Sequence, residues 1–179
     1  MPYSRWFKSA VSLLAVLLVI SFVAACDGAG ESRSTGLSAS CELGSYDEFW
    51  SSSSRLSRQW NYRSAEIVEA YVDESVSVEQ YLRTSRAVLP DLENLVAQLR
   101  SLHRCLAAAS EARMFDAVVD SYERKLSGYV YLENSVRLGD IDGEQTAIEI
   151  LMQAQQEGMD ALCAWSEEAV ESMPIDYDC

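Results

Sequence analysis

His103 is the only histidine of this 179-residue chain, and it lies two residues before Cys105. A nucleophilic cysteine needs a base within hydrogen-bonding reach, but residues i and i+2 of a helix point to different sides. A Glu-x-x-His di-metal site is excluded as well, because Arg100 stands three residues before this histidine. We therefore interpret His103 as a solvated or helix-capping residue.

Asp140, Asp142 and Glu144 form a short acidic segment whose alternating carboxylates could hold Ca²⁺. An EF-hand counted from Asp140 needs glycine at its sixth position and glutamate at its twelfth. This chain has Gln145 and Leu151 there. The segment is therefore expected to cap a helix.

Several function classes are excluded by what the sequence lacks. The chain has 14 Lys+Arg against 28 Asp+Glu and no basic cluster, which argues against nucleic-acid binding. It contains no Gly-rich phosphate loop and no Gly-x-Ser-x-Gly turn. Its cysteines do not form the Cys-x-x-Cys pairs of zinc ribbons. We expect no enzyme activity, no cofactor and no metal site.

The first 25 residues have the pattern of an export signal. Arg5 and Lys8 precede an uncharged run, residues 10–25, that is rich in Leu and Val. The run is shorter than the roughly 20 apolar residues that span a bilayer. It ends in small residues, as signal peptides do before their cleavage site. Residues 1–25 are therefore predicted to be a signal peptide.

The end of this signal, Val23-Ala24-Ala25-Cys26, resembles the lipobox of bacterial lipoproteins, in which an aliphatic and two small residues precede an invariant cysteine. The resemblance covers residues 1–26. It implies that Cys26 is lipidated, becomes the new N-terminus and holds the protein on the extracytoplasmic face of the cell membrane or envelope. Two or three acyl chains on one cysteine anchor a protein stably, since each buried CH₂ contributes about 0.8 kcal/mol.

Residues 27–40 are small, polar and rich in Gly and Ser. Such a segment behaves as a flexible coil that spans on the order of 20 Å. With the lipidated Cys26, these residues are predicted to form a tether. The folded domain is expected to occupy residues 41–179.

From about Ser45 onward, the apolar residues recur with a helical period instead of alternating as in a strand. Breaks in the pattern divide the domain into four segments of near-equal length: 45–73, 78–108, 111–138 and 143–172. This pattern predicts an all-α fold, an antiparallel up-down four-helix bundle.

Capping residues support these boundaries. Ser77 and Ser110 are predicted N-caps of the second and third helices. Gly139 is placed to end the third helix in a left-handed conformation. Asp140 or Asp142 is expected to cap the fourth helix.

Pro90 interrupts the second segment, because proline lacks a backbone donor and disfavours helical geometry in the preceding residue. The leucine spacing continues through it without a change of phase, which favours a kink inside one helix. Alternatively, the first helix continues to about Val88 and the second begins at Pro90. That alternative leaves helices of unequal length, which pack poorly as a bundle.

The four remaining cysteines are predicted to form two disulfides, because an even number in an exported chain favours pairing. In an up-down bundle all of them lie towards one end: Cys41, Cys105, Cys163 and Cys179. Pairing Cys105 with Cys163 is least expected, because the second and fourth helices are diagonal in a square bundle. A disulfide needs a Cα separation of about 4.4–6.8 Å. The other two connectivities remain open.

Charge is distributed unevenly along the domain. Between Leu138 and Cys179 there are 11 acidic residues and no Lys or Arg. One interpretation is internal, with the fourth helix packed between basic flanks of its neighbours. The other is external, with the acidic face binding a protein partner that has a basic surface. Tyr62, Tyr131 and Trp165 fall off the inward apolar stripe and are candidates for a contact surface.

Together these features predict a lipid-anchored, extracytoplasmic helical bundle that acts through binding or as part of the envelope structure. The alternative is a bundle that binds or senses a small ligand in an aromatic pocket between its helices.

Overall fold

The computed structural model describes residues 37–168, with side chains to Trp165. Four long helices and one 3₁₀ turn make up most of this part: α2 (Tyr46–Val72), α3 (Val78–Leu102), η1 (His103–Cys105), α4 (Ala109–Leu138) and α5 (Ile141–Glu168). Within residues 37–168 there is no strand, although Leu37 and Leu106 form an isolated antiparallel bridge. The prediction of an all-α fold is confirmed.

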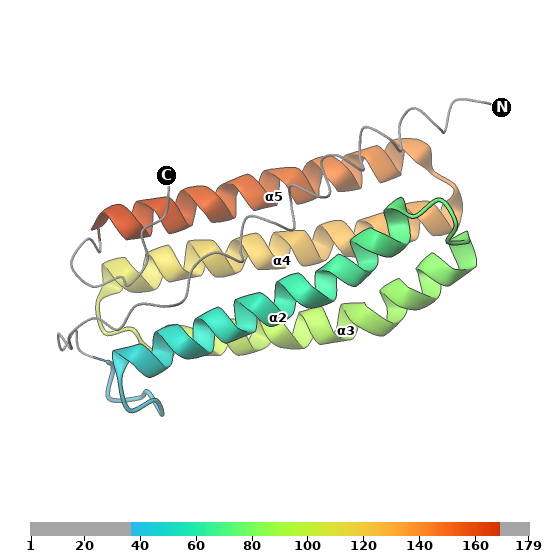
Figure 1. Ribbon diagram of the computed structural model, residues 1–179. Helices are drawn as coiled ribbons and strands as arrows, with labels where there is room; N and C mark the ends of the chain where they lie inside the picture. The colour runs from blue at the N-terminus through green and yellow to red at the C-terminus, as the bar shows by residue number, and fades with distance from the viewer. Residues whose placement is uncertain (1–36, 169–179) are drawn as a thin grey trace.

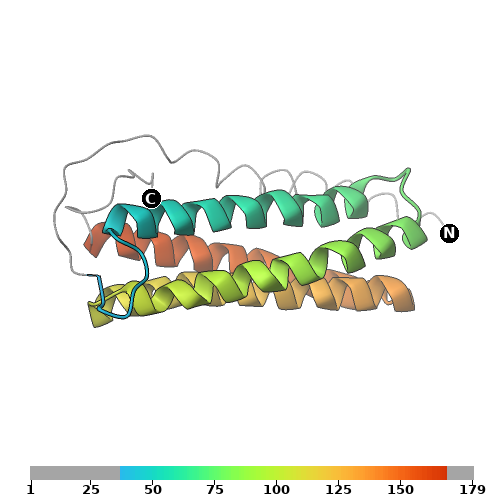
Figure 2. The ribbon, with the colours of Figure 1, turned by 90° about the horizontal axis from the view of Figure 1, so that it is seen from below.

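The helices lie side by side, and each runs in the direction opposite to the one before it (Figure 1). The start of α2, η1 and the end of α5 lie at one end of the bundle, which we call the disulfide end. The α2–α3 and α4–α5 connections lie at the opposite end. Figure 2 shows the segment before α2 reaching back to the end of α3, where a disulfide holds it.

Helices α4 and α5 pack closely because glycines face their neighbours. A Cβ atom on Gly128 would lie 2.9 Å from Leu151, and one on Gly158 would lie 2.6 Å from the Ser121 hydroxyl. Helix α2, by contrast, meets the rest of the core through large aromatic rings. The Trp60 and Tyr122 ring centroids, for example, are 5.2 Å apart.

Local capping signals were mostly predicted correctly. The Ser77 hydroxyl accepts a hydrogen bond from the Gln80 amide, and Gly139 has φ 67°. Asp140 caps α5 by accepting from the Gly143 amide at 3.0 Å. The prediction for Ser110 is wrong, because α4 begins at Ala109, two residues before the predicted start, and its extended N-cap residue, Ala108, makes no side-chain cap.

The second helix ends earlier than predicted, at Leu102 instead of residue 108. The chain tightens into η1 and then becomes extended at Leu106, which pairs with Leu37. Pro90 lies inside the uninterrupted α3, on its exposed side. The interpretation of one helix through this proline is confirmed, and the alternative with a break at Val88 is wrong.

Candidate functional site

The predicted lipidation site, Cys26, lies outside the described residues, as do the signal peptide and residues 27–36 of the tether. Among the helices of residues 37–168, none has the length and apolar character needed to cross a bilayer. The lipid anchor stays a prediction from the N-terminal motif.

A disulfide joins Cys41 to Cys105, with a Cα separation of 4.4 Å. Backbone contacts surround it, since the Ser38 amide donates to the Cys105 carbonyl at 3.0 Å. This bridge belongs to one of the two connectivities that the sequence left open and is incompatible with the other. Cys163 is half-buried on α5, and Cys179 lies outside the described residues.

His103 caps the C-terminus of α3 and is partly exposed, as predicted. Its Nδ1 atom lies 2.7 Å from an Asp116 carboxylate oxygen. Arg100 lies beside it and pairs with Asp120 of α4 at 2.6 Å. This network joins α3 to α4. No group of three or more metal-binding side chains occurs within the part of the chain that the structure describes.

The acidic segment after α4 has the expected capping role, and it also links two helices. Glu144 accepts a hydrogen bond from the Tyr71 hydroxyl at 2.8 Å, which ties α5 to α2 at the end opposite the disulfide. Burial raises the pKa of Tyr71, and this hydrogen bond adds to the rise. Further along α5, Glu157 pairs with Arg124 of α4.

The three aromatic residues predicted for a contact surface behave differently. Tyr62 is 73% exposed and Tyr131 is 41% exposed. The prediction for Trp165 is wrong, because it is only 1% exposed. Its ring lies 4.7 Å from the Trp50 ring and 5.8 Å from the Phe115 ring, measured between centroids, so it belongs to an aromatic cluster inside the disulfide end.

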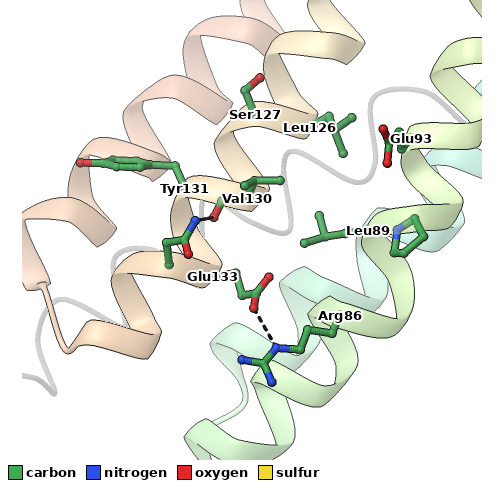
Figure 3. Close-up of a pocket in the computed structure, with 10 residues that line it drawn as sticks. Arg86, Leu89, Glu93, Leu126, Ser127, Val130, Tyr131 and Glu133 are labelled. Carbon is green, nitrogen blue, oxygen red and sulfur yellow. Dashed lines mark hydrogen bonds and ion pairs between the residues drawn. The ribbon is translucent and has the colours of Figure 1, made fainter.

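An open groove of about 620 Å³ runs between α3 and α4 (Figure 3). Its lining is mixed: Arg86, Leu89, Pro90 and Glu93 from α3, and Leu126, Ser127, Val130, Tyr131, Glu133 and Asn134 from α4. We call it the α3–α4 groove. The Arg86 guanidinium donates to Glu133 at 3.1 Å and links the two helices across it.

The walls of this groove are largely apolar, with charge at the rim. Figure 3 shows Leu89 pointing from α3 towards α4, and Tyr131 extending away from α3. Val130 is 42% exposed, although it is a large apolar residue. Glu93 is exposed and forms no ion pair with another residue between 37 and 165.

A second hollow, of about 50 Å³, lies where α2, α4 and α5 meet. Its lining comes from all three helices: Trp60, Asn61, Ser64 and Val68 of α2, Lys125 and Tyr129 of α4, and Leu151 and Gln155 of α5. We call it the Lys125 cavity. The residue Lys125 is 5% exposed, and its Nζ atom lies 5.0 Å from the centroid of the Tyr122 ring.

Burial lowers the pKa of Lys125 to about 8, because an apolar environment disfavours the charged amine. Burial also raises the pKa of Tyr129 to about 12, and a hydrogen bond with Ser64 opposes part of that rise. Lys125 was not among the functional residues predicted from the sequence. The available signal was its spacing, because Lys125 follows Tyr122 by three residues and precedes Tyr129 by four, which places all three on one helix face.

Comparison with protein-family models, with curated proteins and with solved structures finds no match for this chain. The features of this chain that bear on its function are the N-terminal motif, the disulfide, the α3–α4 groove and the Lys125 cavity.

Proposed function

We propose that this protein is a lipid-anchored, extracytoplasmic binding protein whose helical domain contacts a partner protein through the α3–α4 groove. The observation that carries the proposal is the groove itself, whose apolar walls lie open to solvent beside an exposed carboxylate, Glu93. Surfaces of this kind are typical of protein interaction sites, where apolar contacts give affinity and charges select the partner.

Two features support export and anchoring. The lipobox-like motif before Cys26 fits a lipoprotein signal, and the Cys41–Cys105 disulfide fits an oxidising compartment. The tether would join the domain at the disulfide end, because Cys41 is covalently held there. Pro90 lies fifteen residues from Cys105, about 22 Å along the helix axis. Anchoring at Cys26 would thus hold the groove away from the lipid surface.

The bundle is proposed to be the up-down four-helix type with two disulfides. Since Cys41 pairs with Cys105, the second bridge would join Cys163 to Cys179. Mass spectrometry of the unreduced protein should then find no free thiol in the mature chain. A Cys179 that reacts with an alkylating reagent would contradict this second bridge.

The partner is expected to be basic, with an apolar side chain at its contact point. Removal of residues 1–25 takes away two bases and no acid, so the mature chain has 12 Lys+Arg against 28 Asp+Glu. An apolar group of the partner would lie between Leu89 and Val130, and a basic group would pair with Glu93. The net negative charge of the mature chain would also speed its association with a cationic protein.

A small-ligand function has less support. The Lys125 cavity measures about 50 Å³, whereas pockets for organic ligands usually measure about 300–1,000 Å³. The α3–α4 groove has the volume, but it is open to solvent.

The anchor is tested by Cys26→Ser, with Ser32→Ala in the tether as the matched control. The control protein should incorporate radiolabelled palmitate and stay with membranes, and Cys26→Ser should do neither. Palmitate labelling that persists in Cys26→Ser would contradict the anchor.

The groove is tested by a photo-crosslinking amino acid at position 130, with position 62 as the control, because both residues are exposed but only Val130 lines the groove. A single adduct is expected from position 130 and none from position 62. Glu93→Lys should abolish the adduct by repelling a basic partner. An adduct unchanged by Glu93→Lys, or equal labelling from both positions, would contradict the proposed surface.

A further inference from the structure

Lysine is almost absent from this protein. The chain has two lysines, Lys8 within the signal and Lys125 in α4, so the mature chain has one lysine beside 11 arginines. Arginine stays charged under all ordinary conditions, whereas a lysine amine becomes a nucleophile when it loses its proton. Among the residues that the structure describes, Lys125 is the one charged residue that is buried.

The Lys125 cavity lies in a seam that is closed at both ends. Near the disulfide end, α2 meets α5 through Trp50 and Trp165, whose ring centroids are 4.7 Å apart. Near the opposite end, the Tyr71 hydroxyl donates to Glu144 at 2.8 Å. Between these two contacts, Lys125 of α4 lines the cavity together with side chains of α2 and α5.

We propose that Lys125 is a covalent binding site for a short-chain aldehyde of two or three carbons. The neutral amine attacks the carbonyl carbon and forms a C–N bond, and one amine proton moves to the carbonyl oxygen, which becomes a hydroxyl. That hydroxyl then leaves as water with the second amine proton, and a C=N bond forms. The overall reaction, amine plus aldehyde to imine plus water, needs no oxidant or reductant.

The cavity fits this ligand in size and lining. One water needs about 10–15 Å³ of such space, so about 50 Å³ has room for roughly three or four non-hydrogen atoms. Asn61 and Gln155 contribute amides to the lining that can hydrogen-bond the intermediate's hydroxyl, whereas the Ser64 hydroxyl already donates to the Asn61 carbonyl. The apolar side chains of Val68 and Leu151 would contact the carbon chain.

Burial gives the amine its reactivity. With a pKa of about 8, roughly a quarter of Lys125 is neutral at pH 7.5, against about 0.1% of an ordinary lysine. A lower pKa also weakens a nucleophile, so the net gain is smaller than the ratio of these fractions. We expect Lys125 in the folded protein to react at least tenfold faster than in the unfolded chain.

The test is reductive trapping of the mature lipoprotein in detergent micelles with acetaldehyde and cyanoborohydride at pH 7.5. Trypsin does not cleave after an alkylated lysine, so the product is a peptide of residues 125–137 in place of 126–137. The variant Arg113→Lys supplies a reference amine on the exposed side of the same helix. Lys125 should be trapped at least tenfold faster than this reference amine and than the guanidinium-unfolded chain.

Two further arms test the cavity apart from the reactivity of the amine. Benzaldehyde is too large for the space, so it should show no preference for Lys125. Val68→Phe should fill the half-buried edge of the cavity and slow the acetaldehyde reaction at least tenfold, with folding checked by circular dichroism. The proposal is overturned if Lys125 reacts no faster than the reference amine, or if benzaldehyde shows the same preference.

This inference is independent of the proposed partner. Lys125→Arg should abolish trapping, because it removes the amine, but it should leave membrane anchoring and crosslinking at position 130 unchanged. In the protein that retains Lys125, normal aldehyde trapping without a crosslink at position 130 would instead count against the α3–α4 groove.

Discussion

Replacing Lys125 by methionine should stabilise the protein at neutral pH. Methionine keeps the unbranched shape of the side chain but has no charge to desolvate, and buried charges are often replaced by apolar residues without loss of stability. Burial lowers the pKa of Lys125 from 10.5 to about 8. At about 1.4 kcal/mol per pKa unit, protonated Lys125 then costs the folded state about 3 kcal/mol.

The expected gain is smaller than this cost, because the substitution also removes the contact between the ammonium and the Tyr122 ring. Such contacts contribute about 0.5–2 kcal/mol. We expect Lys125→Met to raise the free energy of unfolding by about 1–3 kcal/mol at pH 7.

The gain should depend on pH in a defined direction. The folded pKa of Lys125 lies below its unfolded value, so between pH 8 and 10.5 the unfolded chain binds more protons than the folded one. Wild-type stability therefore rises over this range relative to the variant. The advantage of Lys125→Met should be complete below pH 8 and should shrink as the pH approaches 10.5. Burial raises the pKa of Tyr81 and Tyr129 to about 12, and this effect cancels in the difference because both proteins retain them.

Urea denaturation at pH 7, 8, 9 and 10, with the disulfide intact, measures this difference. Arg113→Met is the matched control, because Arg113 is exposed on the same helix and should show a small difference that does not change with pH. Equal stabilities of wild type and Lys125→Met at pH 7 would refute the reasoning. A difference that stays constant from pH 7 to 10 would refute it as well.

Two further changes test the packing of the bundle. Replacing both Cys41 and Cys105 by alanine removes a covalent link across 64 residues. The chain-entropy relation predicts that the free energy of unfolding, measured by urea denaturation, falls by about 4 kcal/mol. A decrease below about 1 kcal/mol would contradict this prediction. Gly128→Ala would place a Cβ 2.9 Å from Leu151, whereas Gly139→Ala meets no atom within 4 Å but must hold φ 67°. Gly128→Ala should cost about 1–3 kcal/mol through overpacking, and Gly139→Ala about 1 kcal/mol through backbone strain. Thermal melting should therefore rank Gly128→Ala as the less stable variant. The reverse order would show that α4 and α5 separate easily.

Local signals account for the predictions that succeeded. The helical period, the Ser77 cap, the Gly139 terminus and the Asp140 cap all depend on residues within one or two turns of each other. Such interactions are encoded in short stretches of sequence. The continuation of α3 through Pro90 could be predicted for the same reason, because the apolar spacing kept its phase on both sides.

Two of the predictions that failed depend on contacts between distant segments. The end of α3 depends on the pairing of Leu106 with Leu37, and nothing within the helix indicates it. The burial of Trp165 depends on Trp50, more than a hundred residues away. Spacing along one helix gives the direction of a side chain, but the neighbouring helix determines whether that direction is covered.

The amino-acid sequence alone determined that this chain is helical, where most of its helices start and stop, and that its N-terminus has the pattern of a lipoprotein signal. These properties follow from the order of neighbouring residues. Only the tertiary structure decided that Cys41 pairs with Cys105, that α3 and α4 leave a groove between them, and that Lys125 lies inside. Each of these depends on how segments that are distant in the sequence pack against one another, which no single segment determines.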